Sequence, residues 1–162
     1  MKKLLVLAAV LLVSACGVKP TPVVAAGPAP TLRNPAADGR GGDLVLYFVL
    51  DGRVAPVSRT TGAPASVTTA LTTLLRGPSS AESSDGYATM LPPESGPIGL
   101  SPGSPTVITF SFPLKRLTPI ATNQLVCTAL AALAAEGSYV DGGALSLGGS
   151  DVQLPSQTCQ AF

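Results

Sequence analysis

The composition of the chain changes near residue 42, and this change limits how much of the 162-residue sequence can fold. Between residues 17 and 42, prolines at positions 20, 22, 28, 30 and 35 stand among alanine, glycine and valine. Proline removes backbone donors, glycine adds conformational entropy, and the segment has too little apolar surface to offset the cost of ordering. We therefore expect a disordered tether over residues 16–42 and one folded domain over residues 43–162, a length that suits a single hydrophobic core.

The first residues have the pattern of a secretory signal. Two lysines precede the apolar run Leu4–Val13, which is too short to span a bilayer, since a spanning helix needs about 20 residues. The run ends in Val13-Ser14-Ala15-Cys16, which resembles the lipobox of bacterial lipoproteins. The resemblance implies a signal peptide over residues 1–15, cleavage between Ala15 and Cys16, and a diacylglycerol and acyl (palmitate-type) lipid on Cys16. An ordinary secretory signal with an incidental cysteine and an uncleaved anchor are the alternatives.

A lipidated Cys16 would place the chain on the outer face of the cell membrane, with the membrane itself as one partner. Without Lys2 and Lys3, eight basic residues stand against nine acidic ones, with no basic run, so we expect no nucleic-acid partner. The sequence has no histidine and no Gly-x-Ser-x-Gly elbow, so we expect no enzyme. No metal and no cofactor other than the covalent lipid are expected.

Cys127 and Cys159 remain once Cys16 is assigned to lipid. An even number of cysteines outside the reducing cytosol usually pairs, so we predict a disulfide that ties the second helix to the C-terminal tail. In the chain-entropy model such a closure contributes about 3–4 kcal/mol. Two independent buried thiols are the alternative.

Residues 44–60 have the pattern of a β-hairpin. The run Leu44–Leu50 is continuously apolar and predicts a central strand covered on both faces. Asp51-Gly52 is a strong turn signal, and Arg53–Arg59 is expected to return as a second strand. Pro56 would place this second strand at an edge or a bulge.

Two helices and three further strands are expected after the hairpin. Residues 64–76 carry an apolar stripe at helical spacing and end at Gly77-Pro78, whereas Thr118-Pro119 begins a second helix that ends near Glu136. On that helix we expect one inward face, formed by Val126, Cys127, Leu130, Leu133 and Ala134. Residues 97–100, 106–112 and 144–147 read as strands. The order predicts an α+β fold, a single small domain in which two helices pack on one face of a mixed β-sheet.

Four motifs in order carry a family resemblance. They are Leu46-Tyr47-Phe48-Val49, Leu74-Leu75-Arg76-Gly77-Pro78, Gly86-Tyr87-Ala88-Thr89-Met90-Leu91-Pro92-Pro93, and the segment 121–130 with Gln124 before an apolar pair and a threonine. Together they resemble the GerM-type domain, often called GerMN, of sporulation and spore germination. The resemblance covers nearly the whole globular part. It implies a lipoprotein of the actinobacterial envelope type and a protein partner, such as a sensor kinase or another copy of the chain.

The motif residues form the candidate site of the sequence. For Gly77, Pro78, Gly86, Pro92 and Pro93 we favour structural roles in a helix exit, a backbone twist and a stiff segment end, with a part in an interaction surface as the alternative. Leu91 belongs to the same motif, as a structural or an interaction residue. Tyr87, Thr89 and Gln124 could line a shallow ligand or partner surface, or could be a core tyrosine, a turn hydroxyl and a helix-flank amide. Asp85 and Glu94 flank this motif and are expected to be solvated loop charges.

Two functions therefore remain open. The favoured one is a non-catalytic cell-envelope lipoprotein whose GerMN-like domain mediates protein interaction, envelope signalling or assembly. The alternative is a module that binds a small ligand or a cell-wall glycan around Tyr87. The sequence has no tryptophan and only seven other aromatic residues, so it offers few stacking platforms for a sugar.

Overall fold

The computed structural model describes residues 42–62, 65–93, 96–138 and 140–160, and all structural statements below concern these residues. The expected signal peptide, the lipid site Cys16 and the expected tether up to residue 41 lie outside them, as do Pro64 and Glu94. Gly42, the last residue of the expected tether, already accepts a hydrogen bond from the Thr61 N–H at 3.0 Å.

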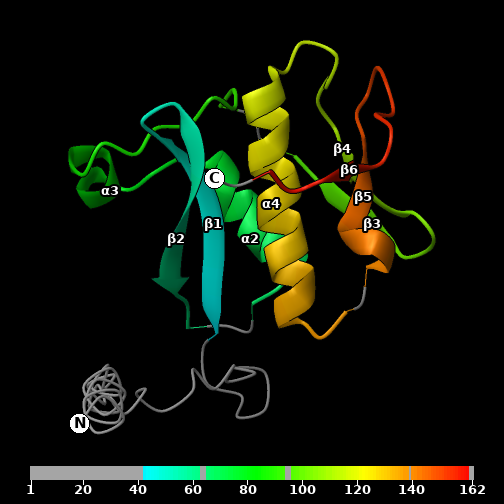
Figure 1. Cartoon of the computed structure of the whole chain (residues 1–162), viewed down its shortest axis with the longest axis horizontal. Helices are drawn as coiled ribbons and strands as arrows, with labels where there is room; N and C mark the ends of the chain where they lie inside the picture. The colour runs from blue at the N-terminus through cyan, green and yellow to red at the C-terminus, as the bar shows by residue number, and fades with distance from the viewer. Residues whose placement is uncertain (1–41, 63–64, 94–95, 139, 161–162) are drawn as a thin grey trace, which may run out of the picture. The chain divides into compact units, whose positions relative to one another are not determined.

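The described residues form an α+β domain, as predicted, in which helices separate two sheets (Figure 1). The elements in chain order are β1 (Asp43–Leu50), β2 (Arg53–Thr60), α2 (Val67–Leu75), α3 (Ser80–Ser84), β3 (Ile98–Ser101), β4 (Thr106–Phe110), α4 (Pro119–Ala135), the 3-10 helix η2 (Asp141–Gly143), β5 (Ala144–Gly148) and β6 (Gln157–Thr158). Strands β1 and β2 pair as an antiparallel hairpin, and the second sheet has the order β3-β4-β5-β6. This second sheet is mixed, because β4 and β5 are parallel whereas its other pairs are antiparallel.

The hairpin turn follows the prediction. Asp51 and Gly52 both have positive φ, 51° and 75°, as a two-residue type I′ turn requires. Pro56 lies opposite Tyr47 on the exposed strand β2. Because the Tyr47 N–H and C=O bond to α4 rather than to β2, this is a pair without mutual hydrogen bonds, so the missing proline N–H removes no bond from the ladder. The edge position predicted for Pro56 is confirmed.

Strand β1 is not a central strand covered on both faces, as the sequence predicted. It buries Leu44, Leu46 and Phe48 on one face. On the other face Val49 is buried, but Val45 and Tyr47 stay partly exposed. Along its length β1 pairs only with β2, and side chains from α4 together with one bridge to Ala88 occupy its other edge. The backbone groups of Tyr47 and Val49 on this edge are already bonded, so no strand of the second sheet can pair with them. The strands therefore form two sheets, with helices between them, instead of one sheet with helices on one face.

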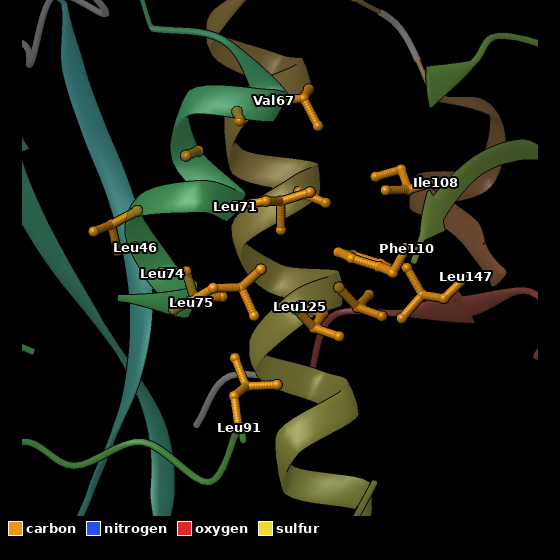
Figure 2. Packing of buried hydrophobic residues seen from close by; sticks show 14 of the residues in the cluster. Leu46, Val67, Leu71, Leu74, Leu75, Leu91, Ile108, Phe110, Leu125 and Leu147 are labelled. Carbon is orange, nitrogen blue, oxygen red and sulfur yellow. The ribbon is translucent and has the colours of Figure 1, made fainter. Parts of the chain in front are cut away.

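Helix α2 supplies one half of the core. It begins at Val67, three residues later than predicted, because the Ser66 side chain caps it and accepts a hydrogen bond from the Thr69 N–H at 3.1 Å. All five residues of the predicted apolar stripe are buried: Val67, Ala70, Leu71, Leu74 and Leu75. They face α4, β1 and the second sheet, where Ile108, Phe110 and Leu147 close the core (Figure 2).

Helix α4 is the centre of the domain. It begins as predicted, with Thr118 as the cap and Pro119 in the first turn. The predicted single inward face is too narrow, since Gln124 and Thr128 are fully buried while Ala134 is exposed. The helix contacts β1, α2, β5 and β6, so it is covered around most of its circumference. Within the described ranges, no helix is long and apolar enough to cross a membrane.

Candidate functional site

Gln124, the polar residue of the second-helix motif, is fully buried and bonded at both ends of its amide. Its Nε2 donates to the Tyr47 carbonyl at 3.0 Å, and its Oε1 accepts from the Met90 N–H at 2.9 Å. Both partners are backbone groups, so the side chain links β1 to the segment that follows Gly86. A ligand cannot reach Gln124 without breaking these bonds.

Thr128, one turn further along α4, also bonds to the backbone of β1. Its Oγ1 accepts from the Tyr47 N–H at 2.9 Å, so Gln124 and Thr128 together satisfy both backbone groups of Tyr47. Next to them, Val49 and Ala88 exchange two backbone hydrogen bonds of 2.8 Å each. The spacing of four residues on the helix is what places an amide and a hydroxyl side by side on one face. We call the edge of β1 at Tyr47 and Val49 the sealed edge.

The other motif residues lie around the sealed edge and make local contacts. Gly77 and Gly86 have φ of +84° and +92°, which residues other than glycine rarely adopt. Leu91 is buried in the core, and the Thr89 hydroxyl accepts from its N–H at 3.2 Å. Tyr87 is partly buried against the core. Pro78 and Pro92 are half-buried, whereas Pro93 and Asp85 are exposed.

An ion pair between β2 and α3 was not predicted. The Arg59 Nε donates to Glu82 Oε1 at 2.8 Å, its Nη2 donates to Glu82 Oε2, and Nη2 also reaches the Gly77 carbonyl at 3.1 Å. The hydrogen bond from Arg59, aided by the Ser79 N–H, lowers the pKa of Glu82 to about 2. Ser79 and Glu82 also form the capping box that begins the short helix α3. The Ser-x-x-Glu spacing was the sequence signal for this helix.

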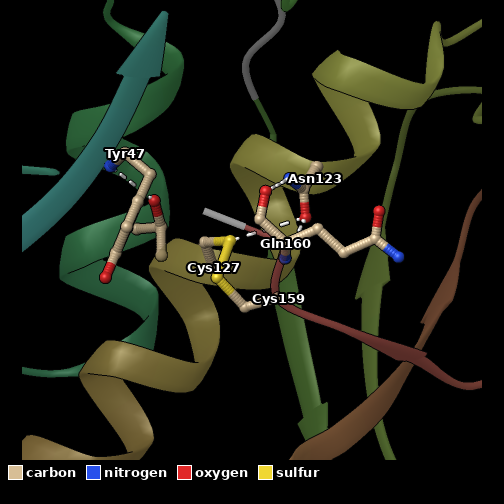
Figure 3. Close-up of a disulfide and its surroundings, with 6 residues drawn as sticks. Tyr47, Asn123, Cys127, Cys159 and Gln160 are labelled. Atoms are coloured by element: carbon tan, nitrogen blue, oxygen red, sulfur yellow. Dashed lines mark hydrogen bonds between the residues drawn. A yellow bond between two sulfur atoms is a disulfide. The ribbon is translucent and has the colours of Figure 1, made fainter. Parts of the chain in front are cut away.

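The predicted disulfide is present and holds the C-terminal tail on α4 (Figure 3). The Sγ atoms of Cys127 and Cys159 are bonded at 2.01 Å, with Cys127 buried and Cys159 half-buried. One turn before Cys127, the Asn123 side chain pairs with the Gln160 backbone: its Nδ2 donates to the Gln160 carbonyl at 2.6 Å, and its Oδ1 accepts from the Gln160 N–H at 2.9 Å. A covalent bond and two hydrogen bonds therefore fix the tail at the first half of α4.

Two grooves flank this fixed tail. The first, which we call the tail groove, has a volume of about 530 Å³. It is lined by Leu114, Lys115, Leu117, Pro119, Thr122, Asn123, Leu154, Ser156, Gln157, Thr158 and Gln160. The second, the hairpin groove, has about 490 Å³ and is lined by Gly52, Arg53, Val54, Pro119, Ile120, Asn123 and Gln160. The two grooves share Pro119, Asn123 and Gln160, so they lie on either side of the contact between α4 and the tail.

The grooves offer amides, hydroxyls and apolar side chains together with one cation each, Lys115 and Arg53. No aspartate or glutamate is among their lining residues. Asp151 lies beside the tail groove, where its carboxylate accepts from the Leu114 and Lys115 N–H groups at 2.7 and 3.2 Å. Desolvation raises the pKa of Asp151, but these backbone donors outweigh it, so the pKa lies below its usual range.

Sequence reasoning did not find the grooves. Tyr87, Thr89 and Gln124, the residues proposed for a ligand or partner surface, line neither of the two. One sequence signal was available: a bond from Cys127 to Cys159 places Gln160 near residue 123, one turn earlier on the helix. The loop at 114–117 forms the opposite wall of the tail groove, and its approach to α4 and the tail depends on long-range packing.

Among the described residues, no group of three or more histidine, cysteine, aspartate or glutamate side chains is arranged to hold a metal ion. Comparison with known proteins found no matching family model, no matching curated protein and no matching solved structure.

Proposed function

We propose that the protein is a non-catalytic cell-envelope lipoprotein whose GerMN-like domain binds another protein in envelope signalling or assembly. The observation that carries this proposal is the pair of adjoining grooves, which a disulfide and the Asn123–Gln160 contact fix in place. Their amides, hydroxyls and apolar walls are groups that can hold and orient a ligand. The family resemblance of the motif residues supports the same function.

The lipobox resemblance supports attachment at the outer face of the cell membrane through Cys16. A disulfide in the folded domain fits this location, since disulfides persist outside the reducing cytosol. Fractionation of cells tests the anchor. The Cys16→Ser variant should leave the membrane fraction, and its unchanged retention would contradict the lipid anchor.

Site-specific crosslinking in intact cells tests the protein interaction. Ser156 lines the tail groove and is exposed, and Ser83 is an exposed serine on α3 that serves as the matched control position. We expect a photo-reactive residue at position 156, but not at 83, to trap the same envelope protein reproducibly. A sensor kinase and a second copy of the chain are the two candidates. Identical products from both positions, or none from position 156, would contradict the proposal.

The alternative function is binding of a small ligand or a cell-wall glycan. The volumes of the two grooves, about 530 and 490 Å³, fall within the range of small-molecule sites. A thermal-shift panel with wall fragments distinguishes the two functions. Stabilisation that Tyr87→Ala abolishes would favour a site at Tyr87, whereas loss in Asn123→Ala alone would place the ligand in the grooves.

A further inference from the structure

Strand β6 ends the second sheet, and its outer side is turned toward the tail groove. The strand order β3-β4-β5-β6 leaves β6 with one partner, β5. In the short ladder, Ala144 lies opposite Thr158 and Leu145 opposite Gln157. Both Gln157 and Thr158 line the tail groove. The groove therefore runs along an edge strand.

The backbone of Thr158 is directed away from β5. The Ala144 N–H donates to the Asp141 carbonyl and therefore does not donate to the Thr158 carbonyl. Ala144 and Thr158 thus lie opposite each other as a pair without mutual hydrogen bonds. In such a pair the N–H and C=O groups point outward. Two residues further on, both backbone groups of Gln160 point to α4 and bond with Asn123, in agreement with this alternation. Thr158 thus presents an N–H and a C=O on the groove side, which we call the open edge.

The charge around the open edge favours an acidic ligand. Lys115 lines the tail groove, and Arg53 lines the hairpin groove next to it. The N-terminus of α4, with its partial positive charge, meets both grooves at Pro119. The one carboxylate beside the groove, that of Asp151, does not line it and already accepts hydrogen bonds from the Leu114 and Lys115 N–H groups.

We propose that the tail groove binds an extended, acidic segment of a partner protein, which adds as a strand to the open edge of β6 and places a carboxylate beside Lys115. This inference rests on the proposed function and names its mode of recognition. An extended peptide supplies the N–H and C=O groups that an open edge bonds, and its alternate side chains enter the groove. The amides and hydroxyls of the lining, such as Gln157 and Ser156, can bond the side chains of the incoming strand.

Binding of labelled hexapeptides to the full-length protein in detergent tests this proposal. The probes alternate valine and threonine, with one glutamate placed at each position in turn, and a second set carries lysine instead. We expect the best glutamate peptide to bind roughly tenfold more tightly than its lysine counterpart, the ratio of a 1.4 kcal/mol difference. Lys115→Glu should remove this preference, whereas Arg76→Glu, the same charge change at an exposed position after α2, should leave it intact.

Two further measurements test the strand pairing itself. Thr158→Pro removes the outward N–H but no bond of the ladder, so it should weaken binding while Thr158→Ala should not. N-methylation of the peptide's amides gives the same test without changing the protein. Alternate N–H groups of a strand point to opposite sides, so methylation of one alternating set should abolish binding and methylation of the other should not. Equal effects of both sets, equal binding of the acidic and basic peptides, or no binding at about 1 mM would overturn the proposal. A groove-specific crosslink at position 156 together with such a result would leave the proposed function standing and reject strand addition alone.

Discussion

The two strand edges that face α4 differ in how many of their backbone groups are hydrogen-bonded. On one side, the sealed edge of β1 has the backbone of Tyr47 bonded by Gln124 and Thr128 and that of Val49 bonded by Ala88. On the other side, the open edge of β6 has only Gln160 bonded, by Asn123. Asn123 and Gln124 are neighbours in sequence, and successive residues of a helix point in directions about 100° apart. One helix can therefore close a strand on one flank and leave a groove beside another.

Loss of the disulfide should have the largest effect on stability and should act first on the open edge. We expect Cys159→Ser to lower the free energy of unfolding by about 3–4 kcal/mol, since the bond closes a loop between residues 32 apart. Urea unfolding of the oxidised wild type and the variant measures the difference. Hydrogen exchange should rise first in residues 156–160, while the sealed edge keeps its protection. Uniform loss of protection would show that the two edges do not open independently.

Gln124→Leu should break the sealed edge. The substitution leaves the Tyr47 carbonyl and the Met90 N–H without their partner near the core, and each unsatisfied buried group costs about 1–3 kcal/mol. We expect a loss of about 3 kcal/mol in urea unfolding, with the disulfide and peptide binding at the tail groove unchanged. A change below about 1 kcal/mol would mean that the amide contributes little to the seal.

The stability that the ion pair between Arg59 and Glu82 contributes should be lost in acid, unlike that of the hydrogen bonds at either strand edge. The folded-state pKa of Glu82, about 2, lies below its ordinary value of 4.5, so its contribution is present above pH 4.5 and lost as the pH falls toward 2. Since the pair is partly solvated, we expect a contribution of about 1–2 kcal/mol rather than the full shift. Unfolding measured at pH 7 and pH 2.5 should show a larger acid-dependent loss in the wild type than in Glu82→Gln. Equal losses would contradict this assignment.

Asn123→Ala should have the smallest effect and should confine it to the open edge. It removes two hydrogen bonds from an exposed site where water can replace them, so we expect a loss of about 1 kcal/mol. The measurement is urea unfolding beside Gln124→Leu, its neighbour in sequence. An Asn123→Ala loss as large as that of Gln124→Leu would remove the distinction between a sealed and an open edge.

Features set by neighbouring residues could be predicted from the sequence. Asp51-Gly52 makes the hairpin turn, Thr118-Pro119 begins α4, and Gly77 follows α2 with positive φ, because each depends on backbone preferences within a few residues. Helix α3 was also local and was missed, although the Ser79–Glu82 capping box was visible in the sequence.

The division into two sheets could not be predicted in the same way. It depends on Gln124 reaching Tyr47 across 77 positions of sequence, and a buried amide in a helix gives no local sign of which strand it will bond. The grooves depend likewise on how the loop at Leu114 and the tail at Gln160 approach α4. Even the apolar pattern of α4 was misleading, since a helix enclosed on most sides does not show a single stripe.

Pro56 should reduce aggregation of copies of this protein through strand β2. The outer side of β2 is the free margin of the hairpin, and a margin with unpaired donors and acceptors is a template on which identical chains can aggregate. The proline has no N–H to offer there, and its ring obstructs an approaching backbone. Crowded copies are thereby discouraged from growing into fibrils through this margin.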